Sequence, residues 1–402
     1  MTGSRPKMGN ATLPPLWLMA LALVAVSANL RSAIASVPPL ARTIATDLDL
    51  SNTWIGALTT LPVLCMGLLA PAAQRLGSRI GSAPSVQIAI IAVFAGVLLR
   101  WAGDQLWALY AGTLVAGFGI AVAGTLLPRL VKAVFPPERT GTITGLYMLA
   151  MMGGAAISSA LSVPLAARLG SWQGSLASWS ILAAVGALAW APVGLRITRY
   201  KAANPVAATS HRLPWRHPTA WLIAAYLAVQ SWQFYSSLAW IAPSYVVRGF
   251  DPTTAGYLLS AFSGAQLISG LLGPILTDRI HDHRALLIPA AGLSLMGMLA
   301  LLLVPDGAAW VWVCLLGLGQ GASFSLALVL LVDYAETPAG SGRLTAMTFF
   351  VSYTIASFGP TVTGGLRDLT GGFEAIWLFL AFLTVLQMAL AMQMKPNLAK
   401  VS

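Results

Sequence analysis

Long apolar stretches recur along almost the whole chain, and they limit its fold more than any other feature. A membrane helix needs about 20 predominantly apolar residues. Twelve stretches of about this length are present, at residues 16–38, 53–73, 84–101, 107–129, 141–165, 173–195, 218–244, 254–275, 285–304, 309–332, 344–366 and 373–394. The sequence therefore predicts an all-α membrane protein with twelve transmembrane helices.

Charged residues are too few to cover a surface that faces water. They make up 9% of the 402 residues, whereas soluble domains carry about 25%. The net charge of +11 would also fit a nucleic-acid-binding protein. However, the basic residues stand in short clusters between the apolar stretches, which is the pattern that orients membrane proteins. We therefore predict a lipid bilayer, and no nucleic acid, as the partner.

Basic residues are divided unequally between the two sides that the predicted helices define. If both termini share a side, that side holds seventeen Lys and Arg residues and the other side holds five. Because basic residues favour the cytoplasmic side, both termini are predicted to be cytoplasmic in a bacterial inner (plasma) membrane. The segment MTGSRPK and the apolar residues after it show no cleavage site, which favours a retained first helix over a signal peptide.

An internal duplication divides the chain into two parts. The stretch LVAGFGIAVAGTLL in the fourth predicted helix is similar to LLGLGQGASFSLAL in the tenth, which aligns Gly117 with Gly317 and Gly119 with Gly319. Such repeats are typical of transporters. We predict two pseudo-symmetric six-helix bundles, 1–195 and 218–402. The basic segment 196–217 is interpreted as a cytoplasmic linker that touches anionic lipid, with a regulatory docking site as the alternative.

The loop after the second predicted helix, APAAQRLGSRIG, is similar to the cytoplasmic signature of the major facilitator superfamily, Gly-x-x-x-Asp-Arg-x-Gly-Arg-Arg. Arg75, Gly77 and Arg79 fit this signature, and Gln74 stands where the family has an acidic residue. After the eighth helix an acidic–basic pair is restored. The resemblance implies alternating access, with conformational gating by Arg75, Arg79, Asp278 and Arg279. The departure at Gln74 affects the charge relay that stabilises the outward-facing state in this family.

Four further stretches resemble the cyanate and 2-nitroimidazole transporter branch of that superfamily. They are NLRSAIASVPPL (29–40), LLPRLVKAVFPPERTGTITGLY (126–147), QSWQFYSSLAWIAP (230–243) and FGPTVTGGLRDLTGGF (358–373). The resemblance runs over nearly the whole chain. It implies a transporter of a small molecule and leaves the substrate open, because members of the branch differ in substrate.

Arg31 is the one charge that we place inside a predicted membrane helix. A charge at the bilayer centre costs roughly 3 kcal/mol on insertion scales, so such a residue normally faces a cavity or a partner. All twelve acidic residues fall in loops or at helix ends. An unpaired guanidinium favours an anion, so Arg31 is predicted to bind the substrate. In the alternative, Arg31 snorkels outward or bonds carbonyls freed near Pro38 and Pro39.

The seventh predicted helix, the symmetry mate of the first, is unusually polar. Aligning Pro39 with Pro243 places Tyr235 opposite Arg31. Other polar side chains lie in the fifth, eighth, tenth and eleventh helices and near Arg31. Each could instead form hydrogen bonds between helices. The predicted substrate-binding residues are Arg31, Asn29, Gln233, Tyr235, Ser237, Trp240, Tyr147, Gln266, Gln320 and Tyr353.

Motifs for other chemistry are missing from the sequence. It contains no Gly-x-x-x-x-Gly-Lys-Ser/Thr loop for ATP and no His-Glu-x-x-His metal motif. The two cysteines, Cys65 and Cys314, are far apart, and the four histidines fall in predicted cytoplasmic loops. We therefore predict no catalytic residue, no metal and no cofactor.

Together these features predict a monomeric secondary transporter that moves a small anion or weak acid by alternating access. No buried carboxylate or histidine is available for proton coupling. The substrate would bring its own proton, or the protein would exchange or equilibrate substrates. Two alternatives remain. One is an exporter of neutral or weakly acidic nitro-heterocycles or drugs, and the other is a membrane receptor or enzyme with a transporter fold.

Overall fold

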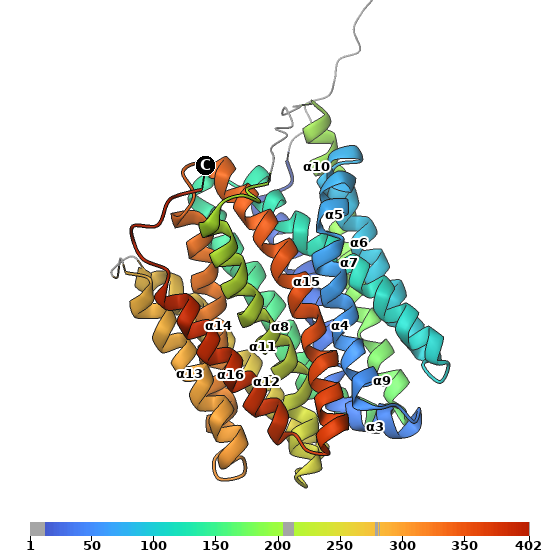
Figure 1. Ribbon diagram of the computed structural model, residues 1–402. Coiled ribbons are helices and arrows are strands. Elements are labelled where there is room, and N and C mark those ends of the chain that lie inside the picture. The colour runs from blue at the N-terminus through green and yellow to red at the C-terminus, as the bar shows by residue number, and fades with distance from the viewer. Residues whose placement is uncertain (1–12, 204–212, 278–279, 281, 402) are drawn as a thin grey trace, which may run out of the picture.

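The computed structural model describes residues 13–203, 213–277, 280 and 282–401. Within these ranges the chain is almost wholly helical, and its extended structure is limited to one isolated bridge between Ala335 and Val401. The long helices run roughly side by side from one end of the molecule to the other (Figure 1).

The N-terminal half, by which we mean residues 13–203, holds ten α-helices and two short 3₁₀ helices. They are α1 (Leu16–Ser27), α2 (Asn29–Ala35), η1 (Pro38–Leu40), α3 (Ala41–Asp47), α4 (Asn52–Leu68), α5 (Ala70–Arg79), α6 (Ser82–Leu99), η2 (Arg100–Ala102), α7 (Leu106–Val134), α8 (Pro137–Leu169), α9 (Trp172–Ser178) and α10 (Ser180–Ala203). The first, second, third and sixth predicted stretches are each broken into consecutive pieces.

The C-terminal half, residues 213–401, holds six α-helices at the positions of the last six predicted stretches. They are α11 (Pro218–Val247), α12 (Pro252–Thr277), α13 (Arg284–Leu303), α14 (Ala309–Asp333), α15 (Pro338–Thr370) and α16 (Glu374–Met392).

Nine helical segments of the described chain are long and apolar enough to cross a membrane, and the pair α4–α5, bent by 53°, makes a tenth. The all-α membrane fold is therefore confirmed. The remaining helices, α11 and α15, have 30 and 33 residues. They are long enough to cross a membrane, and their composition keeps them out of this group. In α11 every residue from Gln233 to Val246 is buried, so protein rather than lipid surrounds its polar side chains. For these two helices the count of twelve stays a prediction.

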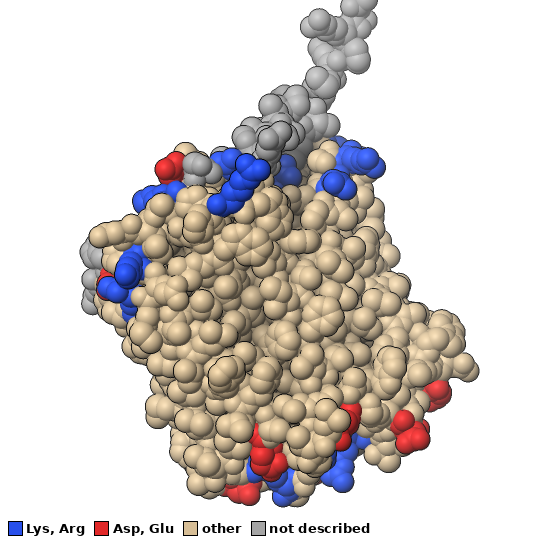
Figure 2. All heavy atoms as spheres, in the orientation of Figure 1, with Lys and Arg blue, Asp and Glu red and all other residues tan. Residues whose placement is uncertain are grey.

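Charged side chains gather toward the two ends of the molecule and leave a broad uncharged band between them (Figure 2). We call one end the basic end. It carries Arg75, Arg79, Arg129, Lys132, Arg139, Arg196 and Arg199. We call the opposite end the acidic end. It carries Asp47, Asp49, Asp104, Asp251, Asp306, Asp368 and Glu374. The uncharged band is what a bilayer core requires.

The two halves contact each other from the acidic end to the middle of the molecule. Between α4 and α15, the Thr361 hydroxyl donates a hydrogen bond to the Thr60 hydroxyl at 2.8 Å. A Cβ atom at Gly56 would collide with the carbonyl oxygen of Pro360, so glycine is needed for this approach. Between α8 and α12, a Cβ atom at Gly256 would lie 2.7 Å from the carbonyl oxygen of Ser159.

Candidate substrate site

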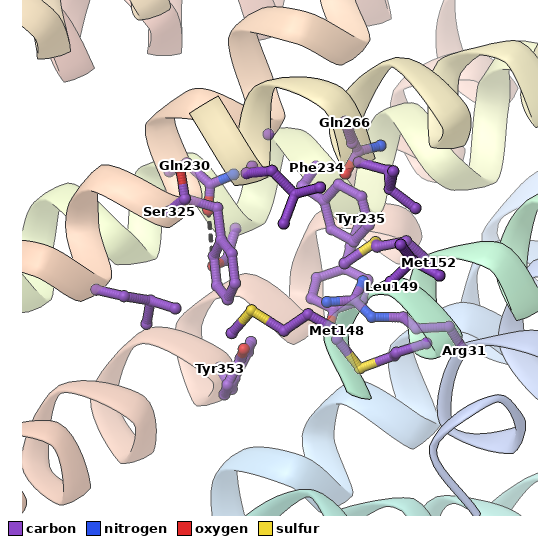
Figure 3. A pocket seen from close by; sticks show the side chains of 18 residues that line it. Arg31, Met148, Leu149, Met152, Gln230, Phe234, Tyr235, Gln266, Ser325 and Tyr353 are labelled. Atoms are coloured by element: carbon purple, nitrogen blue, oxygen red, sulfur yellow. Dashed lines mark hydrogen bonds between the residues drawn. The ribbon is translucent and has the colours of Figure 1, made fainter. Parts of the chain in front are cut away.

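A cavity that is partly open to its surroundings lies between the two halves; the empty space there is about 670 Å³ when the adjoining open solvent is included. Its walls come from α2 and α8 of the N-terminal half and from α11, α12, α14 and α15 of the C-terminal half (Figure 3). On α8 the lining residues Met148 to Met152 precede the contact at Ser159, and on α12 they follow the contact at Gly256. The contacts between the halves therefore separate the cavity from the acidic end.

Arg31 projects from α2 into this cavity with 5% of its surface exposed. Its guanidinium carbon lies 4.6 Å from the ring centre of Phe234 and 5.3 Å from that of Tyr235. These are cation–π distances. Nη1 of Arg31 is buried and has no hydrogen-bond partner in the described chain. The two salt bridges found there, His283–Asp333 and Arg284–Asp282, are elsewhere.

The carbonyls freed near Pro38 and Pro39 are bonded by other side chains than Arg31. The Ala33 carbonyl accepts a hydrogen bond from Nη1 of Arg100 at 2.7 Å. The Ala35 carbonyl accepts one from the hydroxyl of Ser159 at 3.2 Å. In the alternative interpretation Arg31 bonds these carbonyls, but in the structure Arg100 and Ser159 bond them instead.

Arg100 corrects the expectation that Arg31 is the one charge inside a membrane helix. The sequence analysis counts Arg100, at the end of the third stretch, among the five basic residues on the non-cytoplasmic side, but its side chain is fully buried. It belongs to η2, which extends the apolar segment Ser82–Ala102. Hydropathy alone does not show that neighbouring helices bury the end of a helix.

Four of the predicted substrate-binding residues line the cavity: Arg31, Tyr235, Gln266 and Tyr353. The rings of Tyr235 and Tyr353 meet edge to face with centres 6.3 Å apart. The Tyr235 hydroxyl lies 3.8 Å from the sulfur of Met66. Tyr235, which the alignment of the two prolines placed opposite Arg31, thus lies beside Arg31 at the cavity wall.

Gln233 and Gln320 lie away from the cavity lining, in the interior of the C-terminal half. The Gln320 side-chain amide donates to Oε1 of Gln233 at 3.1 Å, and the Gln233 amide donates to Oε1 of Gln387 at 3.0 Å. The Gln230 amide donates to Oε1 of Gln320 at 3.0 Å. This glutamine chain, Gln230–Gln320–Gln233–Gln387, ties α11 to α14 and α16. Its Gln230 member also lines the cavity.

The other predicted site residues are not brought to the lining either. The Asn29 amide donates to the carbonyls of Ala25 and Leu182. The Trp240 indole donates to the Thr363 hydroxyl at 2.8 Å. Ser237 and Tyr147 are buried outside the lining set. Polarity located the right helices, but it does not determine which face of a fully buried helix meets the cavity.

Apolar residues that the sequence analysis did not select form much of the cavity wall. Met148, Met151 and Met152 recur at spacings of three and four on α8, and Phe234 and Phe324 face them from α11 and α14. In the sequence this spacing is the same as that of a packed or lipid-facing helix face.

The two predicted gating residues that the structure describes, Arg75 and Arg79, lie away from the cavity. Arg75 and Arg79 are exposed on α5 at the basic end. Asp278 and Arg279 lie outside the described residues, so gating by the four stays a prediction.

Comparison with known proteins agrees with this architecture. The Major Facilitator Superfamily family profile matches residues 19–360 and 248–397. The chain is 30% identical to the "Cyanate transport protein CynX" of Escherichia coli (strain K12), over 94% of this chain and 97% of that protein. It is 29% identical to the "2-nitroimidazole transporter" of the same organism, over 90% and 92%. The predicted resemblance to this branch is confirmed.

The fold is also found in solved transporter structures. The "Bacterial Homolog to Human Lysosomal Transporter, Spinster", in an inward-facing and unoccupied conformation, superimposes with a TM-score of 0.70. It covers 98% of each chain at 16% identity, so the likeness shows the fold alone. The chain is thus a multi-pass membrane transporter for a small molecule rather than an enzyme, and it belongs to the major facilitator superfamily.

Proposed function

We propose that this transporter moves a small anion, or the anionic form of a weak acid, by alternating access, and that Arg31 binds the substrate. The main support for this proposal is that Nη1 of Arg31 is buried at the cavity wall without a hydrogen-bond partner in the described chain. Burying an unpaired guanidinium is costly. An anion in the cavity would offset that cost with charge-assisted hydrogen bonds.

The names of the relatives support a substrate of this kind. Cyanate is a monoanion, and a nitro group presents two oxygens that accept hydrogen bonds from a guanidinium.

A second candidate substrate class is the neutral or weakly acidic nitro-heterocycle, which an exporter would carry. The methionine side chains of α8 and the ring of Phe324 favour it, because they offer apolar surface to a flat ring. In that case Arg31 would polarise a nitro or carbonyl oxygen instead of neutralising a charge.

For the orientation, we propose that the basic end is cytoplasmic, in a bacterial inner membrane, with both termini on that side. The contacts between the halves lie toward the acidic end, so this conformation would be inward-facing. We propose a monomer as the functional unit.

Uptake into proteoliposomes tests this proposal, with cyanate, nitrite and 2-nitroimidazole as substrates. We expect at least one to cross with wild type, and Arg31→Ala to abolish that flux. Arg168→Ala is the matched control, because Arg168 is exposed near the acidic end and away from the cavity. Equal flux through the Arg31 variant and wild type would overturn the role of Arg31. Binding without flux would favour a receptor.

A further inference from the structure

A second arginine, Arg100, is buried in the N-terminal half, and the proposed transport cycle does not use it. None of its surface is exposed. Its Nη1 donates to the Ala33 carbonyl, while Nε and Nη2 have no partner within the described residues. No carboxylate pairs with it in the described chain. A purely structural site would be served as well by an apolar side chain of similar volume.

The acceptor of this bond lies in the short helix that carries Arg31. Helix α2 has seven residues, and Ala33 is two residues beyond Arg31. Pro38 and Pro39 have no N–H groups, so the regular hydrogen-bond ladder ends before them. The Val37 N–H bonds to the Ile34 carbonyl at 3.3 Å, in a tightened turn, instead of to Ala33. The Ala33 carbonyl is therefore free to accept a hydrogen bond from a side chain.

Arg100 reaches that carbonyl from a different part of the bundle. It stands in η2, and its Cγ atom lies 3.4 Å from where a Cβ of Gly112 on α7 would be. The side chain thus connects η2, α7 and α2. The Ser159 hydroxyl of α8 donates a similar hydrogen bond to the buried carbonyl of Ala35, in the same segment. Two neighbouring helices thereby hold the segment between Arg31 and the proline pair.

We infer that Arg100 is a positioning residue for the Arg31 site. By donating a hydrogen bond to the Ala33 carbonyl, it fixes the orientation of α2 and so directs the Arg31 guanidinium into the cavity. A binding group must be held closely in its productive geometry to be effective. Loss of the Arg100 bond leaves a buried carbonyl unpaired and lets α2 shift. The inference rests on the proposed function, in which Arg31 binds the substrate.

Binding of cyanate, nitrite and 2-nitroimidazole to purified full-length protein tests this role. The variants are Arg100→Met, which keeps the volume but removes donor and charge, and Arg100→Lys, which keeps a charged donor. Arg248→Met is the matched control. Arg248 also donates a hydrogen bond to a backbone carbonyl, from Nη2 to that of Leu301, but it lies in the C-terminal half. We expect Arg100→Met to weaken binding about tenfold, as the loss of one charged hydrogen bond implies. Arg100→Lys should restore most of it, and the control should match wild type.

Hydrogen exchange of the 29–40 segment gives a second readout that needs no ligand. We expect Arg100→Met to speed exchange there, with a melting temperature close to wild type, and Arg248→Met to leave it unchanged. Wild-type affinity and wild-type exchange in Arg100→Met would overturn the positioning role, while loss of binding in Arg31→Ala in the same series would leave the proposed function standing. If wild type binds none of the three probes, the proposed function fails for them, and the exchange result alone decides the role of Arg100.

Discussion

Asp368, in the last turn of α15, accepts two hydrogen bonds from Thr53 at the start of α4: one from its backbone N–H at 2.8 Å and one from its hydroxyl at 2.6 Å. The neighbouring Asn52 donates two more, from its backbone N–H at 2.9 Å and its side-chain amide at 2.7 Å. One carboxylate thus caps the N-terminus of a helix in the other half. At the basic end, by contrast, Gln74 stands where the family signature has an acid.

Replacing Asp368 by Ala removes this cap, so we expect the acidic ends of α4 and α15 to separate more often. Distances between spin labels on the two helices should broaden and lengthen. Asp251→Ala is the control, because Asp251 caps α12 within its own half. An unchanged distance distribution in Asp368→Ala would show that the cap does not hold the halves together.

The same contact should persist over a wide pH range. Partial burial opposes ionisation of Asp368, but the bonds from Thr53 and Asn52 outweigh it and lower the pKa to about 2. Because this folded-state pKa lies below the ordinary value near 3.9, the contribution is complete above about pH 5 and is lost as the pH falls through 2. The spin-label distance should therefore stay constant from pH 8 to 5. A transition within that range would contradict the bonding.

Close approach of α4 and α15 depends on Gly56. In Gly56→Ala the new methyl group would collide with the carbonyl oxygen of Pro360, so the inward-facing packing should lose stability and the transport rate should change. Gly124→Ala is the control, since nothing lies within 4 Å of a Cβ there. Equal transport rates and equal label distances in both variants would mean that the halves do not pack as described.

Within the glutamine chain, Gln233 is expected to stabilise the C-terminal half and not to hold substrate, because it lies outside the cavity lining. Gln233→Leu leaves the partners on Gln320 and Gln387 unpaired in a buried place, which costs about 1–3 kcal/mol. The melting temperature should fall, while the affinity of the remaining folded protein for cyanate, nitrite or 2-nitroimidazole should stay near wild type. A large loss of affinity at unchanged melting temperature would instead place Gln233 in the binding site.

Sequence reasoning located the helices well because apolar length is a direct requirement of the bilayer. It also indicated that Arg31 and Tyr235 lie near each other at a cavity, since a charge inside an apolar stretch is conspicuous and the proline pairing preserves the register between related helices. It missed Arg100, because the burial of a helix end depends on how η2 packs against α6, α7 and α9. It selected Gln233 and Gln320 for a cavity that they do not line. On helices buried on all sides, polar residues face both the cavity and the protein interior, and only packing distinguishes the two.

The most direct test of the central claim is the equilibrium affinity of purified wild type and Arg31→Gln for the panel of cyanate, nitrite and 2-nitroimidazole. Gln fills part of the same space and keeps a neutral donor, so the comparison isolates the guanidinium. We expect wild type to bind at least one panel member and the variant to bind it at least tenfold more weakly, which corresponds to about 1.4 kcal/mol or more. Equal affinity of the two proteins for every ligand that wild type binds would contradict substrate binding by Arg31.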